Sequence, residues 1–152
     1  AKQDKLFYFA PTVVVYRDSD SRCLIMKRHE REVVGGGKWA TPGGKLERKD
    51  LPEQVNRNAL ENLLIRETLE ECGVELIPEF SYLRSLTFVR PDGIPVITLS
   101  FAARYKSGEV ILEAGSFTKH AWVNAEEVKQ YDCLGAIPDE IVQTIQLFTK
   151  SQ

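Results

Sequence analysis

The chain has 152 residues, of which 43% are hydrophobic and 28% charged, and its formal net charge is −2. These values predict one globular domain over 1–152 and exclude a disordered or low-complexity chain. Near-neutral net charge argues against a basic nucleic-acid-binding surface, so we expect no nucleic-acid partner. No apolar run reaches the ~18 residues that span a bilayer, so we expect no membrane partner. The three cysteines are widely spaced without a C-x-x-C pair, which favours neither disulfides nor zinc and makes a cytoplasmic location the expectation.

The first half of the chain predicts short strands followed by one helix. Apolar stretches over 7–17 and 23–27 flank a polar turn, which predicts a β-hairpin. The charged and then glycine-rich segment 28–37 predicts a loop, and a short strand follows at 39–41. Composition and period predict a helix over 58–72, with Gly73 as its C-cap.

The second half predicts a longer hairpin and a terminal helix. Strands over 80–90 and 95–105 are joined by a turn of the Pro-Asp-Gly type. Further elements are expected as short strands at 110–112 and 120–123, a short helix at 125–130 and a last helix from about residue 138. Interleaved strands and helices with antiparallel hairpins predict an α/β chain with a mixed sheet covered by helices.

Three carboxylates mark the C-terminal end of the predicted central helix. At 100° per residue, Glu67, Glu70 and Glu71 fall within one arc of about 100°. The opposite arc, which can face a sheet, holds Leu64, Ile65, Thr68, Leu69 and Cys72. The carboxylates repel one another, the helix dipole disfavours them there, and only Arg66 offers local relief, to Glu70. A hard cation such as Mg²⁺ would offset this cost, whereas a solvated acidic helix end is the alternative.

The glycine turn before this helix favours a cation site over a solvated helix end, because paired glycines allow a ligand to approach the backbone closely. The turn reads Trp39-Ala40-Thr41-Pro42-Gly43-Gly44-Lys45-Leu46-Glu47, and the helix end reads Arg66-Glu67-Thr68-Leu69-Glu70-Glu71-Cys72-Gly73-Val74. Together they resemble the Nudix box of the MutT-like Nudix hydrolases, G-x5-E-x7-R-E-U-x-E-E-x-G-U, where U is a bulky aliphatic residue. The flanking hairpins, the strand with Trp122 and the terminal helix also resemble the family. The resemblance implies the Nudix fold, an α/β/α sandwich with a mixed β-sheet.

The sequence departs from the family pattern in two places. Asp50 stands where the first Glu of the box is usual, and 15 residues rather than seven separate it from Arg66. The eight extra residues fall within 51–64, where 51–54 predicts a turn into an extra helical segment. Farther on, Lys119 or His120 stands where many members place an additional metal-binding Glu, and Glu113 is the nearest upstream acid.

The resemblance implies Mg²⁺-dependent hydrolysis of a nucleoside diphosphate linked to another group, X, by water attack on the pyrophosphate. The expected substrate is a nucleoside triphosphate, ADP-ribose or a nucleotide sugar. Glu67, Glu70, Glu71 and the carbonyl of Gly43 are implied as ligands of Mg²⁺, with Mn²⁺ as a substitute. Glu67 is alternatively the catalytic base, and Arg66 is implied to hold the glutamates.

Candidate substrate contacts surround the glycine turn. They are Lys27, Arg28, Trp39, Gly44 and Lys45. A solvated strand end is an equal alternative for Arg28, and packing in the core is the better interpretation of Trp39. Two other functions stay open: a catalytically weak Nudix domain that senses a nucleotide or nucleotide sugar, and an interaction module with an acidic helix. A homodimer is compatible with the sequence.

Overall fold

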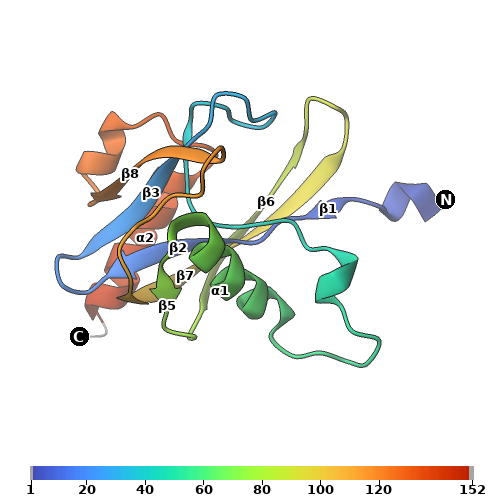
Figure 1. The fold of residues 1–152 in the computed structure, drawn as a ribbon, viewed down its shortest axis with the longest axis horizontal. Helices are drawn as coiled ribbons and strands as arrows, with labels where there is room; N and C mark the ends of the chain where they lie inside the picture. The colour runs from blue at the N-terminus through green and yellow to red at the C-terminus, as the bar shows by residue number, and fades with distance from the viewer. Residues whose placement is uncertain (1, 151–152) are drawn as a thin grey trace.

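A computed structural model describes residues 2–150 (Figure 1). Its strands are β1 (Tyr8–Phe9), β2 (Thr12–Arg17), β3 (Arg22–Arg28), β4 (Trp39–Ala40), β5 (Glu75–Leu76), β6 (Ser81–Val89), β7 (Pro95–Ser107) and β8 (Phe117–Val123). The α-helices are α1 (Ala59–Cys72) and α2 (Ile137–Lys150), and the short 3₁₀ helices are η1 (Lys2–Lys5), η2 (Arg48–Asp50) and η3 (Glu127–Gln130).

The first predicted strand is confirmed but interrupted. β1 and β2 both pair in parallel with β7 and keep one register, since Tyr8 lies opposite Val96 and Thr12 lies opposite Ser100. The break falls at Pro11, which has no N–H to donate to a ladder. β2 and β3 then form the predicted antiparallel hairpin.

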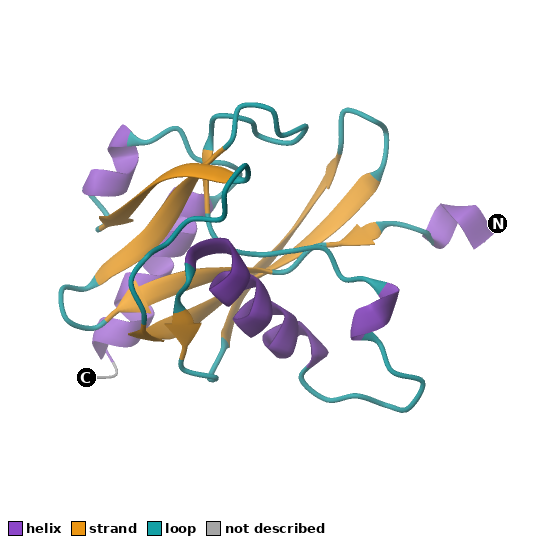
Figure 2. Cartoon of the chain, in the orientation of Figure 1, coloured by secondary structure: helices purple, strands orange, loops and turns teal. Residues whose placement is uncertain are grey.

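The sheet is mixed, as predicted, because β1 and β2 run parallel to β7 while the other pairings are antiparallel. Alternate residues of β2 serve two cores. Val14 belongs to the core that includes Ile141 of α2, and Val13 belongs to the core that includes Leu64 of α1. Figure 2 shows α1 in front of the strands and α2 behind them. This arrangement confirms the α/β/α sandwich.

Two predicted elements are wrong. The segment 110–112 is not a strand; it follows the end of α1, where the Ile111 N–H donates to the Cys72 carbonyl (2.9 Å) and the Glu113 N–H donates to the Glu71 carbonyl (2.8 Å). These bonds satisfy carbonyls that a helix end leaves without intrahelical partners. The expected extra helical segment is also missing, because 51–58 has no helix and all eight residues are exposed. Its two apolar side chains, Leu51 and Val55, are both exposed, so a helix there would gain little from packing.

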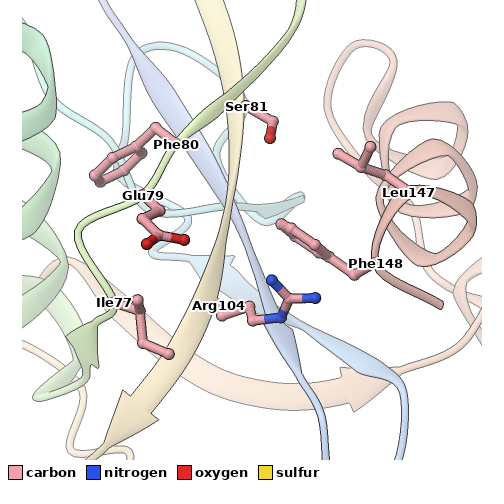
Figure 3. Close-up of a pocket in the computed structure, with 7 residues that line it drawn as sticks. All are labelled: Ile77, Glu79, Phe80, Ser81, Arg104, Leu147 and Phe148. Atoms are coloured by element: carbon pink, nitrogen blue, oxygen red, sulfur yellow. The ribbon is translucent and has the colours of Figure 1, made fainter. Parts of the chain in front are cut away.

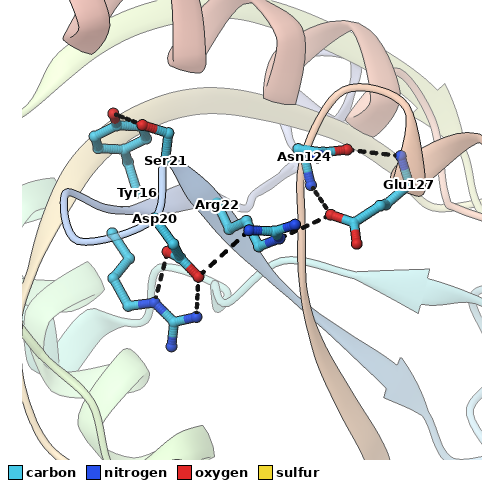
Figure 4. Close-up of polar contacts among 7 residues, drawn as sticks. Tyr16, Asp20, Ser21, Arg22, Asn124 and Glu127 are labelled. Atoms are coloured by element: carbon cyan, nitrogen blue, oxygen red, sulfur yellow. Dashed lines mark hydrogen bonds and ion pairs between the residues drawn. The ribbon is translucent and has the colours of Figure 1, made fainter.

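Ion pairs join the β2–β3 turn to the segment after β8 (Figure 4). Arg17 and Arg22 both pair with Asp20, and the Arg22 Nε donates to Glu127 Oε1 at 2.8 Å. The Asn124 N–H also donates to that Glu127 oxygen (3.0 Å). These contacts hold together the end of the sheet at the β2–β3 turn, away from the C-terminal turn of α1 that carries Glu67, Glu70 and Glu71 (the acidic turn). Within residues 2–150, no helix is long and apolar enough to cross a membrane.

Candidate active site

Helix α1 places the glutamates beside the core. It ends as predicted at Gly73, whose φ of 73° is left-handed and whose N–H donates to the Leu69 carbonyl. Leu69 is 50% exposed and does not face the sheet, whereas Leu63 is only 1% exposed and packs in the α1-side core. Residues four apart share a helical face, so Glu67 and Glu71 continue the row of the buried Leu63. The face of α1 that packs on the sheet is therefore rotated from the predicted one, and it includes Leu63 instead of Leu69.

Glu71 is the most perturbed carboxylate of this row. Its Oε1 accepts a hydrogen bond from the Gly43 N–H at 2.9 Å. Burial raises the pKa of Glu71 to about 8, the hydrogen bond from Gly43 opposes that shift, and the negative charges of Glu67 and Glu113 add to it. The fold thus holds an acidic group whose negative charge is poorly compensated.

Glu67 lies against the other glycine of the turn. A methyl group at Gly44 would lie 2.9 Å from Cγ and 3.0 Å from Cδ of Glu67, and one at Gly43 would lie 2.5 Å from the Pro11 carbonyl oxygen. Neither glycine has a left-handed backbone, so close packing requires them. Burial, and then the charge of Glu70, raises the pKa of Glu67. The glycine turn and the acidic helix face are therefore in direct contact.

Arg66 pairs across the connector and not with Glu70 as predicted. Its Nη1 lies 2.9 Å from Asp50 Oδ1, and its Nη2 lies 3.5 Å from Glu67 Oε1. The Glu47 N–H also donates to Asp50 at 2.9 Å, and this bond, followed by Arg66, lowers the pKa of Asp50. Asp50 thus anchors Arg66 beside Glu67 despite the eight inserted residues.

The donor set suits a hard divalent cation. Glu67, Glu70, Glu71 and Glu113 offer carboxylate oxygens, which Mg²⁺ prefers, and their mutual repulsion would be relieved by positive charge. Among residues 2–150, no three acidic, histidine or cysteine side chains already surround one point. The sequence alone could not place Glu113 here, because its approach depends on the hydrogen bonds between 111–113 and the end of α1.

The candidate substrate residues divide between the two faces of the sheet. Arg28 bonds the Val34 carbonyl (2.9 Å) and Glu32 (3.3 Å), and its positive charge lowers the pKa of Glu71. Lys27 shares one face of β3 with the α2-side residues Cys23 and Ile25, so it lies on the side of the sheet opposite α1.

Trp39 and Lys45 each contact a tyrosine. The Trp39 ring meets Tyr131 edge-on at 4.7 Å and packs on the α2-side core, as the core interpretation expects. Lys45 is exposed, and its Nζ lies 4.9 Å from the centre of the Tyr8 ring. Of the five candidates, Arg28, Gly44 and Lys45 therefore adjoin the acidic turn or its glycine loop.

Two hollows lie away from the acidic turn. One, of about 230 Å³, is lined by residues of the β5–β6 connection, the start of β6, β7 and α2 (Figure 3). Its cation, Arg104, stacks on Phe148 at 4.3 Å and contacts Asp18 at 3.3 Å. The other, of about 430 Å³, lies beside the tip of the β6–β7 hairpin and has no titratable lining residue. Neither contains a residue of α1 or of the glycine turn.

Comparison with known proteins identifies a family. The model of the NUDIX domain matches residues 8–145. Similar solved structures include a MutT protein from Methanosarcina mazei Go1, with a TM-score of 0.71, 22% identity and coverage of 97% of this chain and 98% of that one.

Two further structures resemble the chain over most of both lengths. The MutT NUDIX hydrolase from Burkholderia pseudomallei has a TM-score of 0.70 and 21% identity, and the match covers 92% of this chain and 98% of that one. The NUDIX domain of Shewanella oneidensis NrtR, solved with ADP ribose, has a TM-score of 0.72 and 18% identity, with coverage of 97% and 92%. At these identities the structures establish the fold. A search of curated proteins finds no match.

Proposed function

Because the chain belongs to the NUDIX domain family and is a Nudix-type pyrophosphohydrolase, we propose that it hydrolyses a nucleoside diphosphate linked to another group, X, with the help of Mg²⁺. One observation carries this proposal. Glu71 is held by the Gly43 N–H while burial raises its pKa to about 8, and Glu67 and Glu113 add negative charge beside it. A fold gains little stability from such a group, whereas a cation site gains a pre-positioned ligand.

The residues take distinct roles in the proposed reaction. Glu70, Glu71 and the carbonyl of Gly43 would hold the cation, with Glu67 as a further ligand where it does not serve as the base, and the bound cation would neutralise charge on the phosphate oxygens. Water attacks one phosphorus and the bond from that phosphorus to the bridging oxygen breaks; in the alternative in which Glu67 is the base, its carboxylate accepts the proton of the water. The raised pKa of Glu67 suits a base, and Arg66, held by Asp50, keeps its carboxylate in place. The products are a nucleoside monophosphate and phosphorylated X.

One similar structure contains a candidate substrate. The NUDIX domain of NrtR was solved with ADP ribose, and two of the other similar structures are MutT proteins. The ADP-ribose in the NrtR structure supports ADP-ribose as a substrate of this chain, and the family resemblance adds a nucleoside triphosphate or another nucleotide sugar as candidates. A panel of these compounds, assayed for phosphate or nucleoside monophosphate release with and without Mg²⁺, tests the proposal. Turnover of none of them by folded protein would contradict it.

A sensor is the second candidate function. Its support is that Lys119 and His120 lie exposed on β8, where the family resemblance leads one to expect an additional metal-binding Glu. A sensor would bind ADP-ribose with measurable heat and release no product over hours in Mg²⁺. Turnover that Glu71→Gln abolishes would exclude this second function.

A further inference from the structure

Gly43 lies opposite Thr12 of β2 in an isolated antiparallel bridge. The hydrogen bonds of this bridge join the flanking residues; they run from the Val13 N–H to the Pro42 carbonyl (2.9 Å) and from the Gly44 N–H to the Pro11 carbonyl (3.3 Å). Thr12 and Gly43 therefore form a non-hydrogen-bonded pair, in which opposite residues approach most closely and neither uses its own N–H or carbonyl in the ladder. This pairing leaves the Gly43 N–H to bond Glu71 at 2.9 Å and leaves its carbonyl for the proposed cation.

The methyl group of Thr12 fills the space beside Gly43. A methyl group added to Gly43 would lie 2.9 Å from Thr12 Cγ2. Thr12 alternates along β2 with Val13 of the α1-side core and shares the face of Val14, which belongs to the α2-side core. Helices α1 and α2 lie on opposite sides of the strands (Figure 2). Gly43 is thus contacted by Thr12 from the α2 side and bonded by Glu71 of α1.

A buried polar network fixes the hydroxyl group of Thr12. Its Oγ1 lies 3.2 Å from Ser100 Oγ on β7, and the Ser100 hydroxyl donates to Glu140 Oε2 of α2 at 2.9 Å. Ser100 has one hydroxyl hydrogen and gives it to Glu140, so Thr12 is the donor to Ser100. Ser100 is 1% exposed and Glu140 is 2% exposed. Because a β-branched side chain has few rotamers, fixing the hydroxyl group of Thr12 also fixes its methyl group.

We propose that Thr12 is a positioning residue of the acidic site: the Ser100–Glu140 pair sets its rotamer, and its methyl group holds Gly43 in place for Glu71 and for the cation. The catalytic consequence of this role rests on the proposed function. A network that only joined α2 to the sheet would need the hydroxyl group of Thr12 and not its methyl group. The positioning role needs the methyl group, and it needs the hydroxyl group only to orient that methyl group.

The first experiment measures the Gly43 N–H itself, in metal-free protein. Hydrogen exchange of this amide is followed by NMR relative to the Gly73 amide, which bonds the Leu69 carbonyl at the other end of the acidic turn. We expect Thr12→Ser, which removes only the methyl group, to speed relative exchange about tenfold by promoting local opening. We expect the conservative Thr12→Val variant to keep the wild-type rate, because valine has a methyl group at both branch positions.

Ser100→Ala tests whether the network acts through Thr12. We expect it to speed Gly43 exchange in the wild type and to add nothing when combined with Thr12→Val, where no hydroxyl group remains to be oriented. Thr98→Ser is the matched control, because Thr98 is half-buried like Thr12 and lies on β7, two residues before Ser100 on the same face. An unchanged rate in Thr12→Ser, an equal change in the control, or an equal effect of Ser100→Ala in both backgrounds would overturn the proposal.

The second experiment connects the position of Gly43 to the site. Mn²⁺ is titrated into each variant without substrate, and kcat and KM are then measured for the compounds of the nucleotide panel that the wild type hydrolyses. We expect Thr12→Ser to bind Mn²⁺ about tenfold more weakly, the scale for losing the support of a metal ligand. We also expect kcat to fall about tenfold with little change in KM, since a small displacement of the site affects the reaction more than binding. Thr12→Val should rescue both properties, and melting temperatures confirm that each variant folds.

The outcomes separate this role from the proposed function. Wild-type affinity for Mn²⁺ in Thr12→Ser, or no Mn²⁺ binding by the wild type, would overturn the positioning role. A fall in kcat that Thr12→Val shares would assign the effect to the hydroxyl network and also overturn it. If the wild type binds Mn²⁺ yet hydrolyses no compound of the panel, the proposed function fails, and a loss of Mn²⁺ affinity in Thr12→Ser that Thr12→Val restores still supports the role of Thr12.

Discussion

Two glutamates on opposite faces of the sheet have different surroundings. Glu140 of α2 is 2% exposed and accepts a hydrogen bond from the Ser100 hydroxyl at 2.9 Å, with Arg84 Nε 3.9 Å away. Glu71 has the Gly43 N–H, while Glu67 and Glu113 add to its pKa shift. Glu140 therefore belongs to a polar network that joins α2 to the sheet. Glu71 belongs to a cluster of negative charges that a bound cation would stabilise.

The Glu71→Gln variant separates charge from shape. We expect turnover to fall by at least about 10²-fold, the scale for losing one pre-organised charge contact in an active site. We expect the metal-free protein to melt at the same or a slightly higher temperature, because the amide removes repulsion with Glu67. Steady-state rates and thermal unfolding in EDTA check both. An unchanged rate, or a large fall in melting temperature, would remove Glu71 from the site.

Glu140 should make stability depend on pH. Burial raises its folded pKa above the unfolded value of about 4.5, so the folded state favours the protonated form. The stabilisation is complete below the unfolded pKa and is lost as pH rises toward the folded pKa. Each unit of pKa shift corresponds to about 1.4 kcal/mol of unfolding free energy at higher pH.

The Glu140→Gln variant tests this dependence by subtraction. Between pH 4 and pH 7, the unfolding free energy of the wild type should fall relative to that of the variant, because glutamine keeps the shape and cannot ionise. Urea unfolding at several pH values measures the difference. A difference that stays constant across this range would show that Glu140 does not titrate between the folded and unfolded states.

At the scale of elements, the sequence predicted well wherever a local signal determines the structure. Gly73 ends α1 because its left-handed φ suits glycine, and the helix begins within one residue of its predicted start. Prediction from the sequence failed where contacts with a segment distant in the chain determine the structure. The partner of Arg66 lies across the connector at Asp50, and 110–112 bonds the end of α1 instead of a strand. The rotation that exposes Leu69 and buries Leu63 depends on how α1 packs on the sheet.

The connector between η2 and α1 should govern substrate choice more than stability. Residues 51–58 are all exposed, and the side chain of Val55 is 98% exposed, so their removal deletes no core contact. Both ends stay linked by the Asp50–Arg66 ion pair beside Glu67. Leu60 is half-buried and Leu63 is in the core, so neither residue forms an exposed apolar surface beside the glutamates.

Deleting 51–58 leaves seven residues between Asp50 and Arg66, the spacing of the family pattern. We expect the melting temperature to shift by only a few degrees and the relative rates across the nucleotide panel to change. Replacing 51–58 with eight Gly and Ser residues is the matched control, because it keeps the length and removes the side chains. Retained folding with an unchanged substrate profile would show that the connector is a decorative loop.

At the scale of the whole molecule, the site lies where the glycine turn crosses from β4 to the start of β2. Val13 donates its N–H to the Pro42 carbonyl at 2.9 Å, which ties the turn to the central strand. From the same turn, Gly43 and Gly44 contact the carboxylates of α1. The sheet and helix α1 thus contact each other through this turn. We therefore expect a change in the charge of the acidic face to change the unfolding free energy of the whole protein.

A divalent cation should therefore stabilise the fold as well as support turnover. A ligand that binds only the folded state adds about 2.7 kcal/mol at a concentration of 100 Kd. For a chain of this length that corresponds to a rise in melting temperature of several degrees. We expect Mg²⁺ to produce this rise in the wild type and a smaller one in Glu71→Gln, and Mn²⁺ to replace Mg²⁺ because both accept carboxylate oxygens. Scanning calorimetry at graded metal concentrations, paired with activity in excess EDTA, measures both effects. Full turnover in EDTA, or an equal metal-induced shift in the variant, would place the cation elsewhere or remove it from the reaction.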